Sequence, residues 1–187
     1  AEDANAPVLG EYHEVDLLIC ETLFEGHLDD LNAAEMAGLV SCFCFRTRAS
    51  EDSEPYFPSK PLEVRFQAIA RLQRQLNAVE RSAKLLQTAE PDPGFLAVAH
   101  GWALGGDVAD VLRNEAMAGG DFVRTMKMLI DLLRQLGSVA PDAVASTARS
   151  AAEALDRGLV QAVGLVEDRA QDANQPDGEV AAQSALT

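Results

Sequence analysis

The sequence has few aromatic residues and no long apolar run. Aromatic side chains make up 5% of the 187 residues. No apolar stretch reaches the roughly 18 residues that a membrane-spanning helix needs. The start of the chain also lacks the basic-then-apolar pattern of a secretory signal. These absences predict a cytoplasmic protein that does not enter a membrane.

Cysteine is scarce as well, because the sequence has only Cys20, Cys42 and Cys44. Cys42 and Cys44 lie two residues apart in the apolar run LVSCFCF. On a helix they would point about 200° apart, so they cannot hold one metal ion together. No pair of His or Cys residues supplies further ligands at zinc-site spacing. We therefore expect free, mostly buried thiols in a reducing compartment.

Basic residues are missing from the first part of the chain. Residues 1–45 contain ten acidic side chains and no Lys or Arg, and the net charge of the whole chain is −15. All basic residues lie between Arg46 and Arg169. A free-standing, non-specific nucleic-acid binder carries a basic face, since phosphate neutralisation supplies most of its affinity. Any nucleic-acid contact of this chain must therefore be local and supported by other domains.

The sequence also lacks the common catalytic motifs. It has no Gly-x-x-x-x-Gly-Lys-Ser/Thr, no Gly-x-Gly-x-x-Gly, no Gly-x-Ser-x-Gly and no His-Glu-x-x-His. Its histidines, His13, His27 and His100, are isolated from one another in sequence. The sequence thus indicates no catalytic centre, no metal site and no cofactor within this chain.

Ala and Leu are abundant, and both lose little side-chain freedom in a helix. Apolar periodicity predicts an all-α bundle of about five to seven helices. We expect residues 1–13 to form a tether, 14–166 one helical domain and 167–187 a disordered polar tail. The predicted helices cover residues 14–24, 33–46, 62–89, a short helix around 95–102, another from 107, 121–136, and a last one from about 141.

Two local signals refine this outline. Asn32 and Glu35 have the layout of a capping box ahead of helix 33–46. The nearly all-apolar run of that helix predicts a central place in the core. Trp102 shares a stripe with Phe95 and Val98, so we expect it in the core rather than as a platform for bases.

The segment GGDFVRTMKMLIDLLRQLG is the most informative part of the chain, and we expect its helix to end at Gly137. One face should be buried, and it consists of Phe122, Met126, Leu129, Leu133 and Leu136. A second face carries Arg124, Lys127, Asp131 and Arg134, with Met128 beside them. This face is either solvated, with Asp131 paired to Lys127 or Arg134, or it contacts a ligand.

Glu21 is unusual because it shares a helical stripe with the apolar residues Leu17 and Phe24. A carboxylate buried along such a stripe needs a partner, since burial of an unpaired charge is costly. An arginine across an interface, such as Arg124, could supply that partner, and so could the hydrogen-bond donors of a ligand.

Two segments resemble a known family. DLLICETLFEGHLDDLNAAEMAGLVSCFCF resembles the opening of the DSHCT domain, the C-terminal helical domain of DExH-box RNA helicases of the superkiller and exosome-cofactor type. That opening reads E-L-x-x-T-E-L-x-F-x-G, followed by a leucine-rich helix that ends in S-C-F-V-F. GWALGGDVADVLRNEAMAGGDFVRTMKMLIDLLRQL resembles the later Trp-Ala-x-Gly motif and the Leu-Leu-Arg-Gln ending of the family. The resemblance covers about residues 14–166, and the aliphatic, acidic character is similar to the actinobacterial HelY-type branch.

The resemblance implies a helical accessory domain packed on RecA-like motor domains that lie upstream in the same polypeptide and bind ATP and Mg²⁺. The implied partners are single-stranded RNA (or DNA) and an RNA-degradation partner. Helix 121–136 corresponds to the ratchet helix of the family, which lies along the strand as it leaves the motor. Met128 stands where the family often has Arg. The implied nucleic-acid-binding residues are Glu21, Arg124, Lys127, Met128 and Asp131.

Two other hypotheses compete with this one. The chain could be a non-catalytic interaction module whose acidic surface docks a nuclease or ribosomal partner, with the Arg124 face left solvated. A small self-contained enzyme is the third hypothesis, and the missing motifs argue against it.

Overall fold

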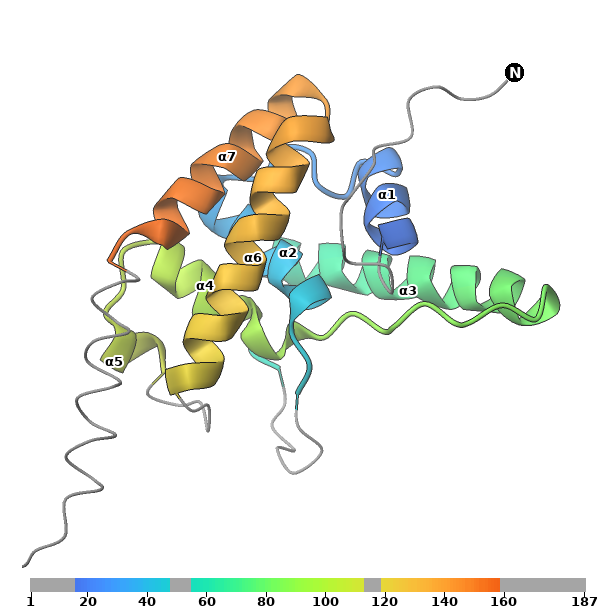
Figure 1. The fold of residues 1–187 in the computed structure, drawn as a ribbon, viewed down its shortest axis with the longest axis horizontal. Coiled ribbons are helices and arrows are strands. Elements are labelled where there is room, and N and C mark those ends of the chain that lie inside the picture. The colour runs from blue at the N-terminus through green and yellow to red at the C-terminus, as the bar shows by residue number, and fades with distance from the viewer. Residues whose placement is uncertain (1–15, 48–54, 113–118, 159–187) are drawn as a thin grey trace, which may run out of the picture.

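The computed structural model describes residues 16–47, 55–112 and 119–158, and each regular element in these ranges is a helix (Figure 1). This confirms the predicted all-α fold. The predicted tether (1–13) and tail (167–187) lie outside the described residues. No helix in the described ranges is both long and apolar enough to cross a membrane. The elements are α1 (Asp16–Phe24), α2 (Ala33–Cys44), α3 (Lys60–Ser82), the 3-10 helix η1 (Pro93–Phe95), α4 (Leu96–Ala103), α5 (Val108–Val111), α6 (Gly119–Val139) and α7 (Asp142–Asp156).

Helix α2 forms the centre of the bundle. The predicted capping box starts it: Glu35 N–H donates to Asn32 Oδ1 and Asn32 N–H donates to Glu35 Oε2, both at 3.0 Å. The helix is buried from Met36 to Phe43 and packs against α4, α6 and α7, as expected from its apolar run. A Cβ on Gly38 would lie 3.1 Å from the backbone oxygen of Leu96, so this glycine allows α2 and α4 to approach closely.

Helices α6 and α7 form an antiparallel pair beside α2 (Figure 1). The predicted buried stripe of α6 is confirmed. The prediction that α6 ends at Gly137 is wrong, because the helix continues to Val139. A Cβ on Gly137 would lie 2.7 Å from Arg149 Cγ, so the glycine serves close packing of α7 rather than a helix end. The stripe residues, each 0% exposed, are Phe122, Met126, Leu129, Leu133 and Leu136.

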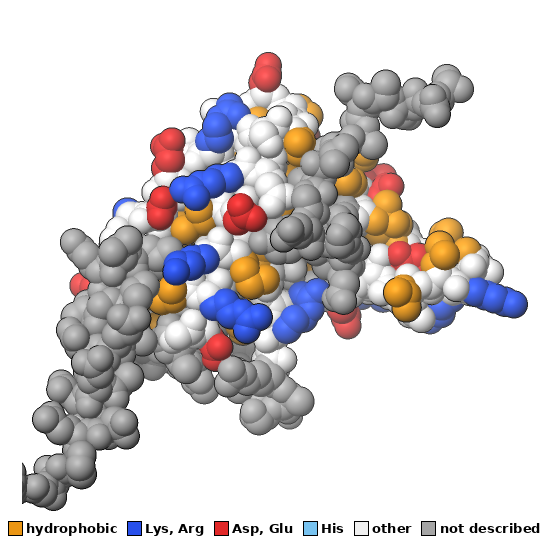
Figure 2. All heavy atoms as spheres, viewed as in Figure 1, with side chains coloured by type: hydrophobic (Ala, Val, Ile, Leu, Met, Phe, Trp, Pro, Cys, Tyr) orange, Lys and Arg blue, Asp and Glu red, His pale blue; other side chains and the backbone are white. Residues whose placement is uncertain are grey.

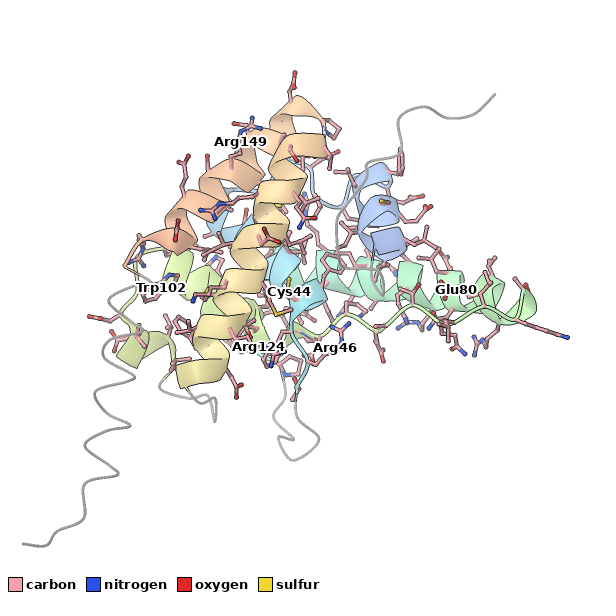
Figure 3. All side chains as sticks on the ribbon, viewed as in Figure 1. Cys44, Arg46, Glu80, Trp102, Arg124 and Arg149 are labelled. Atoms are coloured by element: carbon pink, nitrogen blue, oxygen red, sulfur yellow. The ribbon has the colours of Figure 1, made fainter. Side chains whose placement is uncertain are left out.

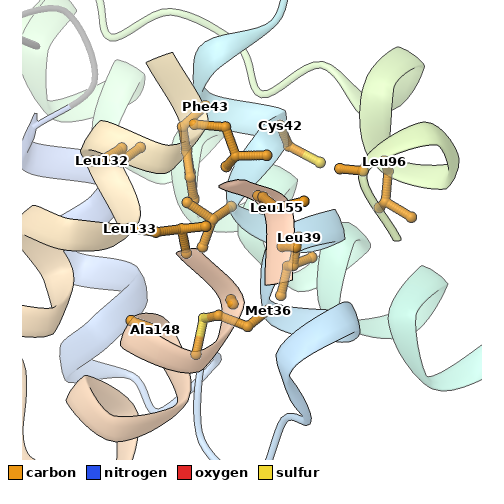
Figure 4. Close-up of a cluster of buried hydrophobic side chains, with 14 of the residues drawn as sticks. Met36, Leu39, Cys42, Phe43, Leu96, Leu132, Leu133, Ala148 and Leu155 are labelled. Atoms are coloured by element: carbon orange, nitrogen blue, oxygen red, sulfur yellow. The ribbon is translucent and has the colours of Figure 1, made fainter. Parts of the chain in front are cut away.

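Trp102 ties α4 to the end of α7, and its predicted place in the core is confirmed. Its side chain is 4% exposed, and its indole N–H donates to the backbone oxygen of Leu155 at 2.9 Å. The ring meets Phe122 edge-on with centroids 5.5 Å apart, and the Arg157 guanidinium lies 4.7 Å from the ring centroid. Figure 4 shows neighbouring core side chains from α2, α4, α6 and α7.

Helix α3 extends away from the bundle as an arm (Figure 1). It ends at Ser82 rather than at 89 as predicted, because Lys84 adopts φ +58° and Leu85 N–H donates to Glu80 O at 2.9 Å, which is the bonding pattern of a Schellman cap. The chain then returns along the helix. Leu86, which lies within the predicted helix 62–89, is 96% exposed.

The returning segment is fastened to α3 by hydrogen bonds to Thr88. The buried carboxylate of Glu80 accepts from the Thr88 hydroxyl at 2.6 Å and from its N–H at 2.7 Å. The Gln73 side chain donates to Thr88 O at 2.9 Å. These contacts join α3 to a residue beyond the turn, and helical periodicity alone does not reveal such contacts.

Candidate nucleic-acid interface

Within the described ranges, no segment covers the face of α6 that lies opposite its buried stripe. Arg124, Lys127 and Asp131 are exposed on this face, and Met128 is half-buried among them. At about 1.5 Å per residue the four span roughly 10 Å along the helix axis. Figure 2 shows Lys and Arg side chains on the face that carries α6 and α7, with Asp and Glu side chains among them. The structure therefore brings together all the predicted site residues except Glu21. We call these four residues the α6 stripe.

Two cations of the α6 stripe have no partner in the described part of the chain. Arg124 and Lys127 make no hydrogen bond or ion pair with a described residue. Asp131 accepts from the Gln135 amide at 2.9 Å, and Arg134 pairs with Asp156 of α7 at 2.9 Å. The interpretation that pairs Asp131 with Lys127 or Arg134 is therefore wrong. Arg134 instead pairs with Asp156 of α7, while Asp131 accepts from the uncharged amide of Gln135 one turn along α6.

Arg46 lies close to this surface and was not predicted as a site residue. It is exposed just beyond the end of α2, and its guanidinium donates to Phe45 O at 2.6 Å. Burial raises the pKa of the nearby Cys44 thiol to about 12, with Arg46 lowering that pKa and Asp131 raising it. Both charges thus act on one half-buried thiol at the end of α2. Figure 3 shows Arg46 and Arg124 in this region. The sequence signal was that Arg46 is the first basic residue of the chain.

Glu21 lies elsewhere, on α1, which packs on α3. The predicted apolar stripe around it is wrong: Leu17 is 47% exposed and Phe24 is 68% exposed, while Leu18 and Ile19 are fully buried. Helix α1 is apolar almost all round, so its sequence does not define one buried face. The carboxylate of the half-buried Glu21 makes no hydrogen bond or ion pair with a described residue, and Arg124 is not its partner.

The surface around α6 can bind charge, but its neighbours offer little reactive chemistry. Cys42 and Cys44 are free thiols, and burial raises the pKa of both, which keeps them protonated. Among the described residues, no three His, Cys, Asp or Glu side chains gather closely enough to hold a metal ion. The arrangement suits electrostatic contact with an anionic polymer.

An all-helical bundle whose helix α6 exposes cations fits the accessory-domain class to which the sequence motifs pointed. Residues 8–162 match the family model described as the DSHCT (NUC185) domain, and the chain belongs to this family. The predicted resemblance is thereby confirmed.

Curated relatives carry helicase names. The chain is 35% identical over 163 residues to "Probable helicase HelY" of Mycobacterium leprae (strain TN), a match that covers 80% of this chain and 18% of the relative. It is 34% identical over 161 residues to the protein of the same name from Mycobacterium tuberculosis (strain ATCC 25618 / H37Rv), with the same coverage. "Exosome RNA helicase MTR4" of Homo sapiens is 28% identical over 126 residues, which cover 65% of this chain and 12% of that protein. The chain thus spans less than a fifth of these relatives.

Proposed function

We propose that this chain is the C-terminal accessory domain of an ATP-dependent RNA helicase. In this proposal the α6 stripe guides single-stranded nucleic acid as it leaves the motor domains. The observation that carries the proposal is the exposed pair Arg124 and Lys127, whose side chains have no partner among the described residues. Membership of the DSHCT family and the helicase names of the relatives support it.

The opposite face of α6 supports this role because it is firmly seated in the core. A buried stripe of large side chains fixes the helix against α2 and α7, so its cations project from a rigid surface. Because α6 is held in place before a strand binds, the helix loses less conformational entropy on binding. A fixed row of charges suits a polymer that must slide past.

The chemistry of the stripe suits contact without sequence recognition. Arg124 and Lys127 can neutralise phosphates, and the Met128 thioether can rest on base faces. Asp131 would repel phosphate at the far end of the stripe and so limit how tightly the strand is held. Glu21 is a more distant member of the proposed path, since α1 lies against α3.

The motor activity would reside in domains other than this chain. Motor domains that bind ATP and Mg²⁺ would pull the strand, and the α6 stripe would limit its backward slipping. This division of labour agrees with the absence of a phosphate-binding motif from the sequence.

The decisive experiment is Arg124→Ala in the full-length helicase. Loss of one charge-assisted phosphate contact should lower unwinding of RNA severalfold, while ATP hydrolysis and thermal stability stay near the parent values. Lys60→Ala is a matched control, because Lys60 is an exposed cation already paired with Glu63 at 2.9 Å. Parallel assays on RNA and DNA substrates show which polymer is preferred.

An interaction module is the second candidate function. It is favoured by exposed apolar side chains on α1, Leu17 and Phe24, beside the acidic residues Glu25 and Asp29. In that case Arg124→Ala would leave unwinding unchanged, while Phe24→Ser would weaken binding to a nuclease or ribosomal partner. Unchanged unwinding would therefore overturn the guiding role.

A further inference from the structure

The outward face of the α3 arm carries a second group of cations. Arg71, Arg74, Arg81 and Lys84 are all exposed. From residue 64 to residue 84 the only acidic residue is Glu80. A chain with net charge −15 thus has a local excess of positive charge along its most protruding element. We call these four residues the α3 basic face.

Contacts within the arm leave this charge uncompensated. Glu80 is buried and is engaged by Thr88, so its carboxylate faces the returning segment rather than solvent. Arg71 and Arg74 make no hydrogen bond or ion pair with a described residue. Arg81 donates from Nε to the backbone oxygen of Asn77 at 3.2 Å, which leaves its terminal nitrogens available.

Three of the four cations share one side of the helix, and Lys84 follows the helix end. At about 100° per residue, Arg71, Arg74 and Arg81 fall within a sector of about 80°, opposite the buried Leu62 and Ile69. Between and beside them lie the exposed, uncharged residues Gln67, Gln75 and Ala78. The sector contains no aromatic side chain. Protein interfaces usually rely on aromatic anchors, whereas phosphate contacts need only cations.

The α3 basic face is linked to the α6 stripe through Arg46. Arg46 borders an open depression that it lines together with Phe66 of α3 and residues Glu90–Pro93. On its other side Arg46 acts on Cys44 together with Asp131 of α6. The same depression also carries the acidic residues Glu90 and Asp92, so Arg46 is a single cation between the α6 stripe and the base of the arm.

We infer that the α3 basic face is a second binding site for single-stranded nucleic acid, continuing the path that begins at α6. The inference rests on the proposed function of the α6 stripe. The contact is made to phosphates, so it is independent of sequence and sensitive to salt. It engages only strands long enough to extend beyond α6 and Arg46.

The test compares Arg71→Gln/Arg74→Gln with the parent in the full-length helicase. Affinity is measured as a function of salt for a short single strand and for one extended by about ten nucleotides. Each lost phosphate contact on a single strand lowers the slope of log K against log salt by about 0.7, so the double variant should lower it by about 1.4. We expect this loss for the long strand alone.

Three controls keep the outcome interpretable. Arg71→Lys/Arg74→Lys keeps both charges and should keep the slope of the parent. Lys60→Gln removes a paired cation from the same helix and should change little. Thermal melting of each variant shows that the arm is still folded.

An unchanged slope for the long strand in Arg71→Gln/Arg74→Gln overturns the inference. If Arg124→Ala still weakens binding at both lengths in that case, the proposed function of α6 stands without it. If the double variant loses only the binding of an acidic protein, the arm is a protein-docking surface and the inference is wrong.

Discussion

Cys42 and Cys44 lie two residues apart, and burial suppresses the reactivity of both thiols. The pKa of each thiol is raised, that of Cys44 to about 12, so the nucleophilic thiolate is scarce at neutral pH. We predict that iodoacetamide at about pH 8 leaves both unmodified in the folded protein and labels both in urea. Peptide mass spectrometry measures this directly. Cys44 is only half-buried, so its fast labelling in the folded protein would show that its pKa is not raised as expected.

His100 adds a pH-dependent contribution to stability. It is half-buried on α4 and faces α2. A Cβ added to Gly38 of α2 would lie 3.3 Å from the Cβ of His100. Burial lowers the pKa of His100 from its ordinary value of 6.5, and Glu35 opposes this only partly. Below about pH 6.5 the unfolded chain therefore binds more protons than the folded chain. The contribution of His100 to stability is complete above about pH 6.5 and is lost as the pH falls toward the folded pKa.

We predict that the parent loses more stability than His100→Gln when the pH is lowered from about 7 to about 5.5. Urea unfolding at both values measures the difference between the two proteins. Equal losses would show that His100 is as well solvated in the folded state as in the unfolded state.

At the scale of elements, the arm depends on one buried carboxylate. Glu80→Ala would leave the buried N–H and hydroxyl of Thr88 without an acceptor, at a cost of about 1–3 kcal/mol. We predict a lower free energy of unfolding by that amount. Glu63→Ala is the control, since its ion pair with the exposed Lys60 is worth at most about 1 kcal/mol. Equal losses in the two variants would contradict the role of Glu80.

The helices differ in how much of their structure the sequence could predict. The buried and exposed faces of helix α6 could be predicted residue by residue because its apolar and charged side chains are cleanly separated, whereas its end and the partner of Asp131 could not. The buried face of α1 was mistaken because almost every side of that helix is apolar. The end of α3 was mistaken because the turn depends on a contact between Glu80 and Thr88. Arg46 was missed because only packing of α2 against α6 brings it near the α6 stripe.

At the scale of the whole molecule, net charge opposes the local cations. A chain with net charge −15 repels a polyanion at long range, while the α6 stripe attracts it only at short range. We predict that the isolated chain binds single-stranded RNA only weakly and that the full-length helicase binds it far more tightly. Fluorescence anisotropy with a labelled strand measures both affinities. Tight binding by the isolated chain would show that local cations outweigh the overall charge.

The glycine at position 137 has a mechanical consequence. At this point α7 packs closely against α6, and large buried side chains hold α6 in the core elsewhere. The helix therefore cannot rotate relative to its neighbours without opening cavities in the core. Any displacement of Arg124 relative to a neighbouring domain must therefore carry the bundle of α2, α4, α6 and α7 with it as a solid unit.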